Sequence, residues 1–270
     1  MCISLEADID MNIYAPTDAP LPICCVDLLQ GAVSCDVKAD IDAILWGMRL
    51  ADIRRYFGQR FWEEETRSAS QAIAAEPSPH LESVSEHSWH VADTALLLAT
   101  NFAHLNASRC VVLAILHDKM ELLIGDYDPL GPDGTGLSTH AFNEEMLKKK
   151  IKAEEQAISQ YIKSLRPSVR REQERLLLEC LQGRTLESRF VKAVDKIQAL
   201  AFVLTKKRGA IELPHLCFTL RFSSKAVTYF PGLRLHYMEL RSRLMKDAAD
   251  FHRCSVLEIE QRAGLGGGVI

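Results

Sequence analysis

Side chains able to bind a metal or move a proton crowd the segment AILHDKMELLIGDYDP, where His117, Asp118 and Glu121 precede Asp126 and Asp128. Imidazole nitrogens and carboxylate oxygens are ligands for divalent metals, and a positioned carboxyl group can transfer a proton. An amphipathic helix normally keeps charge off its buried face. The segment is therefore either an amphipathic helix that runs into a polar turn or the floor of an active site.

Two distant residues complete a possible ligand set. His87 and Asp195 lie in other apolar segments, and with His117 and Asp118 they offer two nitrogens and two oxygens. That set suits Mn, Fe, Co, Ni or Zn, and Mg less well, with positions left open for water and substrate. Adjacent residues of a helix point about 100° apart. His117 and Asp118 can therefore share one ion only if it lies between helices, with the other ligands coming from two further helices.

Each candidate ligand has an alternative without a metal. A lone histidine on an apolar helix face is more often a hydrogen-bonded core residue, and the dipeptide His-Asp also occurs by chance. Asp195 is harder to explain in this way, because a buried carboxylate is costly unless it is paired or bound to a metal. Its partner is then either a metal or a neighbouring basic residue: Arg189, Lys192 or Lys196.

The elements that must position these side chains are helical. Hydrophobic residues recur at spacings of three and four from Ile41 to Tyr56, which predicts a first helix. Ser83 and Glu86 stand in capping-box relation and predict the start of a second helix near Ser85. Further helices are predicted over 107–124, 143–165, 169–181, 187–207, 233–245 and 255–263.

The predicted fold class is all-α, a helical bundle with a short irregular or β-prone extension at its N-terminus. Residues 1–36 form that extension, 37–250 the helical body, and 251–270 a C-terminal helix and flexible tail. The Gly- and Pro-rich segment 127–142 is long for a loop in a compact domain. It is either a lid over a site that begins at Asp126 or a surface insertion.

Composition and charge limit the classes of molecule that this protein is expected to bind. A net charge of −4 gives no reason to expect binding to a nucleic acid polymer or an anionic membrane, so an anionic substrate needs local positive charge or a metal. The sequence has no apolar run long enough to span a membrane. Acidic residues stand where a secretory signal carries basic ones. Eight cysteines without a CxxC pair predict reduced thiols and a cytoplasmic protein.

Three motifs occur in a fixed order over residues 41–207. A Ser-Glu-His begins a helix, a His-Asp-x-x-Glu is followed by Gly-Asp, and a Lys-x-x-Asp comes late in the segment FVKAVDKIQAL. This pattern resembles the HD-domain metal phosphohydrolases. It is similar in particular to the branch that contains bacterial 5′-deoxynucleotidases and their eukaryotic HD-domain relatives.

The resemblance assigns roles to matching positions. The resemblance makes four residues the ligands of one divalent metal ion: His87, His117, Asp118 and Asp195. The candidate metals are Mn, Co, Fe, Zn, Ni and Mg. A site for two metals needs a further histidine downstream of the His-Asp pair, where this chain has Glu121. Glu121 instead matches the acidic residue beside the attacking water, and Asp126 matches a second acidic residue near the sugar and leaving group.

In this branch an arginine upstream of the first ligand binds phosphate, followed by tryptophan in the bacterial members. Arg60 and Trp62 are the predicted counterparts here. Between that arginine and His87 the chain has a longer, acid-rich run. Three other arginines therefore compete for the role: Arg54, Arg55 and Arg67.

The resemblance implies an enzyme that releases phosphate from a small phosphorylated metabolite, a nucleoside 5′-monophosphate above all. The alternatives are a nucleoside triphosphohydrolase or pathway-specific nucleotide phosphatase, and a non-catalytic nucleotide-binding protein with the same fold. A homodimer is expected from the resemblance alone. The basic runs at residues 148–150 and 206–208 are interpreted as solvated faces.

Overall fold

The computed structural model describes residues 34–56 and 81–263. The chain divides into two units, residues 1–38 and 39–270. Most of the predicted β-prone extension lies outside the described residues, which include only its residues 34–36. Three predicted or competing phosphate-site residues also lie outside them: Arg60, Trp62 and Arg67. A division into an extension, a body ending at residue 250 and a tail stays a prediction.

The described residues are helical, which confirms the all-α prediction. Their one pairing of the β type is an isolated bridge between Arg54 and Ser83. In the described part of the chain we find no helix that is both long and hydrophobic enough to span a bilayer. The elements in chain order are α2 (Ser34–Met48), the 3-10 helix η2 (Arg49–Asp52), α3 (Val84–Ala99), α4 (Ala107–Leu116), α5 (Glu121–Ile124), α6 (Glu144–Ser164), α7 (Pro167–Gln182), α8 (Leu186–Lys207), α9 (Leu213–Ser223), α10 (Lys225–Tyr229), the 3-10 helix η6 (Pro231–Leu233), α11 (Arg234–His252) and α12 (Val256–Arg262).

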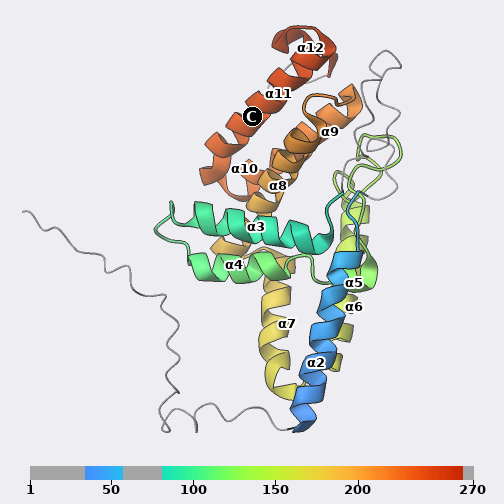
Figure 1. Cartoon of the computed structure of the whole chain (residues 1–270), viewed down its shortest axis with the longest axis vertical. Helices are drawn as coiled ribbons and strands as arrows, with labels where there is room; N and C mark the ends of the chain where they lie inside the picture. The colour runs from blue at the N-terminus through green and yellow to red at the C-terminus, as the bar shows by residue number, and fades with distance from the viewer. Residues whose placement is uncertain (1–33, 57–80, 264–270) are drawn as a thin grey trace, which may run out of the picture. The chain divides into compact units, whose positions relative to one another are not determined.

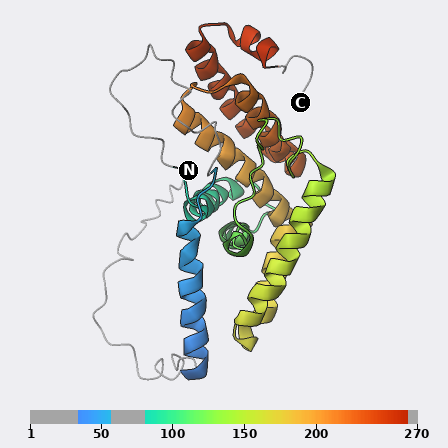
Figure 2. The same cartoon turned by 90° about the vertical axis from the view of Figure 1, so that its right-hand side faces the viewer.

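Helix α8 lies at the centre of the bundle. It packs against α3 and α4 on one side and against α9, α10 and α11 on others. Phe190, Val194 and Leu200 of α8 are fully buried. Helices α3 and α4, which run across Figure 1, are seen nearly end-on in Figure 2. A helix buried on several sides holds its residues in fixed directions, so α8 is a rigid support for Asp195.

The helix starts follow local capping. Ser83 accepts a hydrogen bond from the backbone N–H of Glu86, whose side chain accepts one from the Ser83 N–H, and this confirms the predicted capping box. Thr185 and Ser188 form the same arrangement at the start of α8. These bonds satisfy amides that a helix start leaves without partners. They set where α3 and α8 begin and therefore the register of His87 and Asp195.

The predicted single helix over 107–124 is wrong. Helix α4 ends at Leu116, residues 117–120 form turns, and α5 begins at Glu121. In this turn the N–H of Lys119 bonds to the carbonyl of Leu116, and the N–H of Glu121 bonds to that of Asp118. These bonds span three residues rather than four, so the backbone is tighter than an α-helix there. The His-Asp pair thus lies at a helix break.

Helices α9 and α10 had no counterpart in the prediction. No side chain caps the start of either helix, and their segments carry aromatic and β-branched residues that favour helices weakly. Leu216, Leu220 and Ala226 are nonetheless fully buried. Tertiary packing against α8 supplies the stability that local sequence does not.

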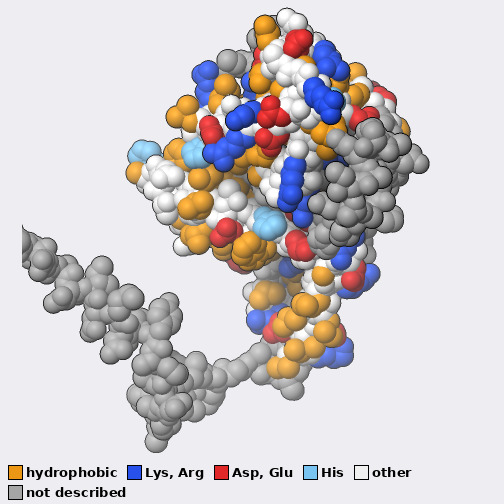
Figure 3. All heavy atoms as spheres, turned by 45° about the horizontal axis from the view of Figure 1, so that its top comes forward, with side chains coloured by type: hydrophobic (Ala, Val, Ile, Leu, Met, Phe, Trp, Pro, Cys, Tyr) orange, Lys and Arg blue, Asp and Glu red, His pale blue; other side chains and the backbone are white. Residues whose placement is uncertain are grey.

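The first predicted helix is confirmed only as far as Met48: the 3-10 helix η2 follows to Asp52, and residues 53–56 are not helical. Part of its hydrophobic stripe faces solvent. Ile44, Leu45 and Met48 are 58%, 62% and 68% exposed. The packed side is another one, where Trp46 stacks on Tyr161 of α6 with 4.8 Å between ring centroids. Hydrophobic side chains lie on the surface of the lower part of the molecule in Figure 3, where α2 runs in Figure 1. A helix that shows most of its apolar side chains to water is unusual for a monomer.

Candidate metal centre

Four side chains from three parts of the chain converge on one point. The Nε2 atoms of His87, on α3, and His117, at the end of α4, are 3.2 Å apart. Asp118 Oδ2 lies 3.1 Å from Nε2 of His117 and 3.4 Å from that of His87. Asp195 Oδ1, from α8, lies 3.3 Å from Nε2 of His87. The structure therefore brings together the two imidazoles and two carboxylates that the sequence singled out.

His87 is fully buried and is oriented by other side chains. Its Nδ1 lies 2.8 Å from Oε1 of Gln198, whose Nε2 donates to Glu82 at 3.2 Å and 3.3 Å. Because the amide nitrogen of Gln198 faces the carboxylate, its oxygen faces the ring and can only accept a hydrogen bond. His87 Nδ1 therefore carries the proton, and Nε2 presents a lone pair to the centre.

His117 is oriented by its own helix. Its Nδ1 lies 2.7 Å from the backbone carbonyl of Ala114, which can only accept a hydrogen bond. The proton is therefore on Nδ1, and Nε2 again presents a lone pair. Such a hydrogen bond from the second ring nitrogen fixes the tautomer and direction of a metal-binding histidine.

The donor set fits a divalent metal ion. Two imidazole lone pairs and two carboxylate oxygens repel one another unless a cation lies between them. His87, His117 and Asp195 each place one ligand atom within 4.8 Å of the others. Asp118 belongs to the same cluster through its distances to both rings.

The ionisation of the cluster shows the same demand for positive charge. Burial alone lowers the pKa of His117, but the adjacent charge and hydrogen bond of Asp118 outweigh it and raise that pKa. Burial raises the pKa of Asp118, but His117 and His87 outweigh it and hold it well below its usual value. A second proton, on Nε2 of His117, would therefore offset the carboxylates without a metal, and a bound metal ion would take its place.

Asp195 has the basic partner that the sequence offered and keeps its other oxygen available for a metal. Its Oδ2 accepts a hydrogen bond from Lys196 at 2.7 Å, while Oδ1 faces His87. Burial raises the pKa of Asp195, but Lys196 and His87 outweigh it and hold that pKa well below its usual value. The basic neighbour and the metal are thus compatible, since they use different oxygens of one carboxylate.

Glu121 and Asp126 lie beside the ligands across a sharp chain reversal. Gly125 ends α5 with φ of +74°, a conformation that other residues adopt only with strain. Glu121 is 5% exposed, and its Oε2 has no hydrogen-bond partner in the described part of the chain. Burial and then Asp118 and Asp126 raise the pKa of Glu121 well above its usual value. Asp126 accepts a hydrogen bond from the Tyr56 N–H at 3.2 Å.

Two of the competing arginines can be placed. Arg54 pairs with Glu86 at 3.3 Å on the surface. Arg55 turns inward, and its Nε and Nη1 are shielded from solvent without a hydrogen-bond partner among the described residues. Burial lowers the pKa of Arg55, but Tyr56, Asp126 and Asp118 outweigh it and raise that pKa. Of these two arginines, Arg55 is therefore the one whose positive charge interacts with Asp126 and Asp118.

A pocket of about 310 Å³ opens beside the ligands. His117, Asp118 and Asp195 line it, and its other walls include residues of α4, α6, α7, α8, α9 and α10. His140, in the segment 127–142, also lines it, so this segment contributes to the site and is not only a surface insertion. Glu121, Asp126 and Arg55 are not among the residues that line it.

Several lysines line this pocket, which the sequence did not reveal. Lys148 and Lys149 are exposed as predicted, but Lys150 is half-buried and lines the pocket, so the solvated-face interpretation is wrong for it. Lys192, Lys196 and Lys225 line it too. Gln198 and Glu82 were also missed as supports of His87. A glutamine within an apolar helix and a lysine at a helix start carry no signal that pattern analysis can use.

Comparison with known proteins gives the family. The family model of the HD domain matches residues 67–226, more than half of the chain. The chain belongs to the HD domain family. HD domain membership, taken with the histidine and aspartate cluster, implies a divalent metal ion.

Curated relatives match a little less than half of the chain. The 5′-deoxynucleotidase HDDC2 of Bos taurus is 33% identical over 119 residues, which covers 44% of this chain and 51% of the relative. The human 5′-deoxynucleotidase HDDC2 is 31% identical over 119 residues, covering 44% and 52%. The 5′-deoxynucleotidase hdd1 of Schizosaccharomyces pombe is 27% identical over 129 residues, covering 47% and 59%. The chain thus spans about half the length of the curated relatives that it matches.

Solved structures share the fold of this HD domain. A predicted metal-dependent phosphohydrolase from Magnetospirillum magnetotacticum is 21% identical, with a TM-score of 0.52, over 77% of this chain and 96% of the other. A conserved hypothetical protein from Pyrococcus furiosus is 24% identical, with a TM-score of 0.50, over 75% and 99%. At these identities the similarity concerns the fold.

Proposed function

We propose that the protein is a metal-dependent phosphohydrolase that releases phosphate from a nucleotide, with a nucleoside 5′-monophosphate as the simplest substrate. The convergence of two imidazole lone pairs and two carboxylate oxygens at the edge of the 310 Å³ pocket carries this proposal. His87, His117, Asp118 and Asp195 are the proposed ligands of one ion. The names of the curated relatives, all 5′-deoxynucleotidases, support the reaction class.

A divalent metal at such a centre lowers the pKa of water and screens charge on a phosphoryl oxygen. Glu121 is the proposed group that orients the attacking water and accepts its proton. Its buried Oε2 without a partner supports this role, because a hydrogen-bond acceptor is available there. The carboxylic acid favoured by its raised pKa becomes a carboxylate when a cation lies nearby.

Asp126 is the proposed proton donor to the leaving ester oxygen. Burial raises the pKa of Asp126, and Asp118 adds to the rise, although Arg55 and the Tyr56 N–H oppose it. A raised pKa favours the protonated form that a general acid needs. Arg55 has unpaired guanidinium N–H groups and is our candidate to hold phosphate oxygens, while Arg60 and Trp62 stay predictions outside the described residues.

The test is the double variant H117A/D118A of the full chain. It should bind no stoichiometric metal and release no phosphate from nucleoside 5′-monophosphates, as measured by elemental analysis and a phosphate assay. The matched control D93A/H104A removes an exposed aspartate and an exposed histidine that do not belong to the ligand cluster. Turnover retained in H117A/D118A would contradict the proposal. Wild-type protein that binds metal and nucleotide without turnover would favour the non-catalytic alternative.

A homodimer and a cytoplasmic location also stay proposals. The exposed apolar side chains of α2 support self-association, since a surface of that kind is often covered by a partner. Ile44→Glu and Leu45→Glu in one variant should convert a dimer to a monomer in light scattering. A monomeric wild type would contradict the dimer.

A further inference from the structure

We propose that the lysines of the pocket form a second anion subsite, so that the preferred substrate is a nucleotide with a second phosphoryl group. This inference rests on the proposed function and narrows its substrate class. A nucleoside 5′-monophosphate is then a minimal substrate. The second group belongs either to a 5′-di- or triphosphate chain or to a separate phosphate on the sugar.

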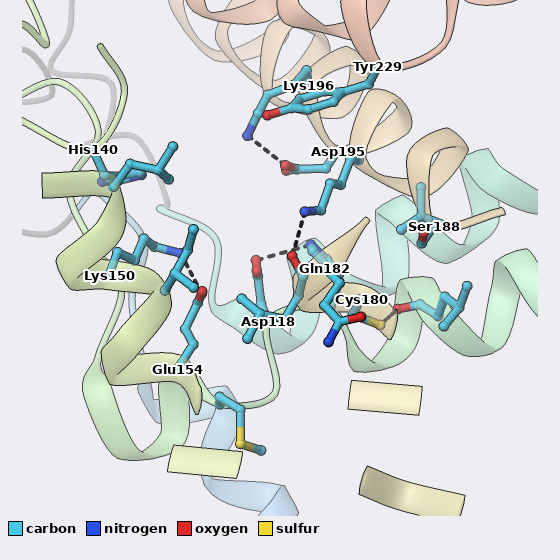
Figure 4. Close-up of a pocket in the computed structure, with 18 of the residues that line it drawn as sticks. Asp118, His140, Lys150, Glu154, Cys180, Gln182, Ser188, Asp195, Lys196 and Tyr229 are labelled. Atoms are coloured by element: carbon cyan, nitrogen blue, oxygen red, sulfur yellow. Dashed lines mark hydrogen bonds and ion pairs between the residues drawn. The ribbon is translucent and has the colours of Figure 1, made fainter. Parts of the chain in front are cut away.

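The lysines come from three elements and surround one space. Lys150 is on α6, Lys192 and Lys196 are on α8, and Lys225 begins α10. Figure 4 shows Lys150 and Lys196 on opposite sides of the space above Asp118, with His140 at its edge. The pocket shares Asp118 and Asp195 with the ligand cluster. An anion held by these lysines therefore lies next to a phosphate held at the metal centre.

Carboxylates compensate only part of this charge. Lys150 pairs with Glu154 at 2.7 Å, and Lys196 pairs with Asp195 at 2.7 Å. Lys192 instead donates to the carbonyl of Leu181 at 2.8 Å, and Lys225 donates to that of Ala141. A carbonyl oxygen accepts a hydrogen bond but carries no full charge to offset an ammonium.

The metal centre does not supply the missing negative charge. Asp118 and Asp195 are the proposed ligands of a divalent cation, which offsets their two charges. Among the described residues that line the pocket, Glu154 is then the carboxylate that remains to face four lysines. Half-buried cations in such excess are costly unless an anion joins them.

Two of the ammonium groups contact the same aromatic ring. Lys196 Nζ lies 4.2 Å and Lys225 Nζ 5.3 Å from the centroid of the Phe222 ring. Burial and the nearby Lys196 lower the pKa of Lys225 to about 8. Burial and three lysines also lower the pKa of His140 to about 3, so its ring is a neutral hydrogen-bonding group. The ammonium groups repel one another, and a negatively charged phosphoryl group placed between them reduces that repulsion.

The volume also suits this ligand class. Pockets for small ligands and cofactors range from about 300 to about 1,000 Å³, and this one has 310 Å³. Leu147, Ile151 and Tyr229 line it beside the lysines and offer apolar contact to a sugar or base. The exposed Lys148, two residues from Lys150, shows what an ordinary solvated lysine of α6 looks like.

The test compares substrates on the metal-loaded full chain. We measure kcat and KM for a nucleoside 5′-monophosphate, the matching 5′-diphosphate and 5′-triphosphate, and the 3′,5′-bisphosphate. A doubly phosphorylated nucleotide should be preferred, and the arm that wins identifies where the second group lies. Lys225→Met keeps the chain on the Phe rings but removes the charge. It should lower that preference about tenfold, mainly through KM, as expected for one charge-assisted hydrogen bond of about 1.4 kcal/mol.

Lys192→Met should act in the same direction, which keeps the test valid if one variant does not fold. Lys225→Arg should restore the preference, and Lys148→Met should leave all constants unchanged. Equal efficiency with all substrates in the wild type, or a preference that survives both methionine variants, would overturn the subsite. If nothing is hydrolysed, calorimetry still measures binding. Tighter binding of a doubly phosphorylated nucleotide without phosphate release contradicts the proposed function and supports the subsite.

Discussion

The two histidines reach the same point by different means. His87, on the α3 side, is fixed by the Gln198 side chain and through it by Glu82, from distant parts of the chain. His117, on the α4 side, is fixed by a backbone carbonyl three residues earlier in its own helix. One orientation therefore depends on tertiary folding and can be removed by mutation. The other follows from the helix itself.

The largest effect on activity should come from changing Glu121, which begins α5, four residues after His117. Glu121→Gln keeps the size of the side chain but removes the base, so kcat should fall by about 10² to about 10⁴, the range for general acid–base catalysis. Metal content should stay near that of the wild type, as measured by elemental analysis. If metal is lost along with activity, Glu121 supports the ligands and does not act on the proton.

Gln198→Leu tests the α3 side of the comparison. Without the amide oxygen His87 loses its orienting acceptor, and metal affinity should fall about 10- to 100-fold, as for other partners of metal-binding histidines. A titration with metal buffers measures this. The matched change on the α4 side is Ala114→Gly, which costs about 1 kcal/mol of helix stability but keeps the carbonyl. It should lower the free energy of unfolding without changing metal affinity, and an equal metal loss in both variants would break the comparison.

Gly125→Ala tests the chain reversal that separates Glu121 from Asp126. No atom lies within 4 Å of a Cβ at this position, so the cost comes from the positive φ alone. We expect a loss of about 1 to 2 kcal/mol in the free energy of unfolding, measured with urea. With ψ of +167° this conformation is one that essentially only glycine adopts, so Asn at this position should cost about as much as Ala. Equal stability of all three proteins would show that the turn adopts another conformation.

The smallest effect, on the free energy of unfolding, should come from changing Glu179 of α7, which connects α4 to the start of α8. Glu179 accepts hydrogen bonds from Arg109 of α4 and from the Thr185 hydroxyl that caps α8. Burial raises its pKa, but these partners outweigh burial and lower it. Because the folded pKa lies below the unfolded one, this stabilisation is present at neutral pH and is lost as pH falls through the folded pKa. Glu179→Gln should cost about 1 kcal/mol at neutral pH and little in acid, as measured by urea unfolding at both pH values.

The sequence predicted most of the helices and the cluster that they hold together. Apolar spacing and the Ser83–Glu86 capping box placed α3 correctly, since both signals are local. Helix α9 was missed because its stability comes from burial against α8, which no local pattern records. The break after Leu116 was missed for a related reason, as the residues of the turn have ordinary helical propensity.

The candidate site was predictable where residue type alone implies chemistry. Histidine and aspartate within apolar helices demand an explanation, so His87 and Asp195 drew attention without any structure. Gln198 and Lys225 do not, because each is ordinary in its own segment and acquires a role only through residues distant in the chain. The supports of the metal and the charge of the pocket were therefore visible only in three dimensions.

The link from Glu82 through Gln198 to His87 joins residues 116 positions apart in the chain. A fragment that lacks either end cannot orient this ligand, so high-affinity metal binding and folding of the chain form one equilibrium. Free metal at 100 times its dissociation constant adds about 2.7 kcal/mol to the free energy of unfolding. A metal ion bound at this centre would therefore stabilise the whole fold, and its removal should make the chain easier to unfold.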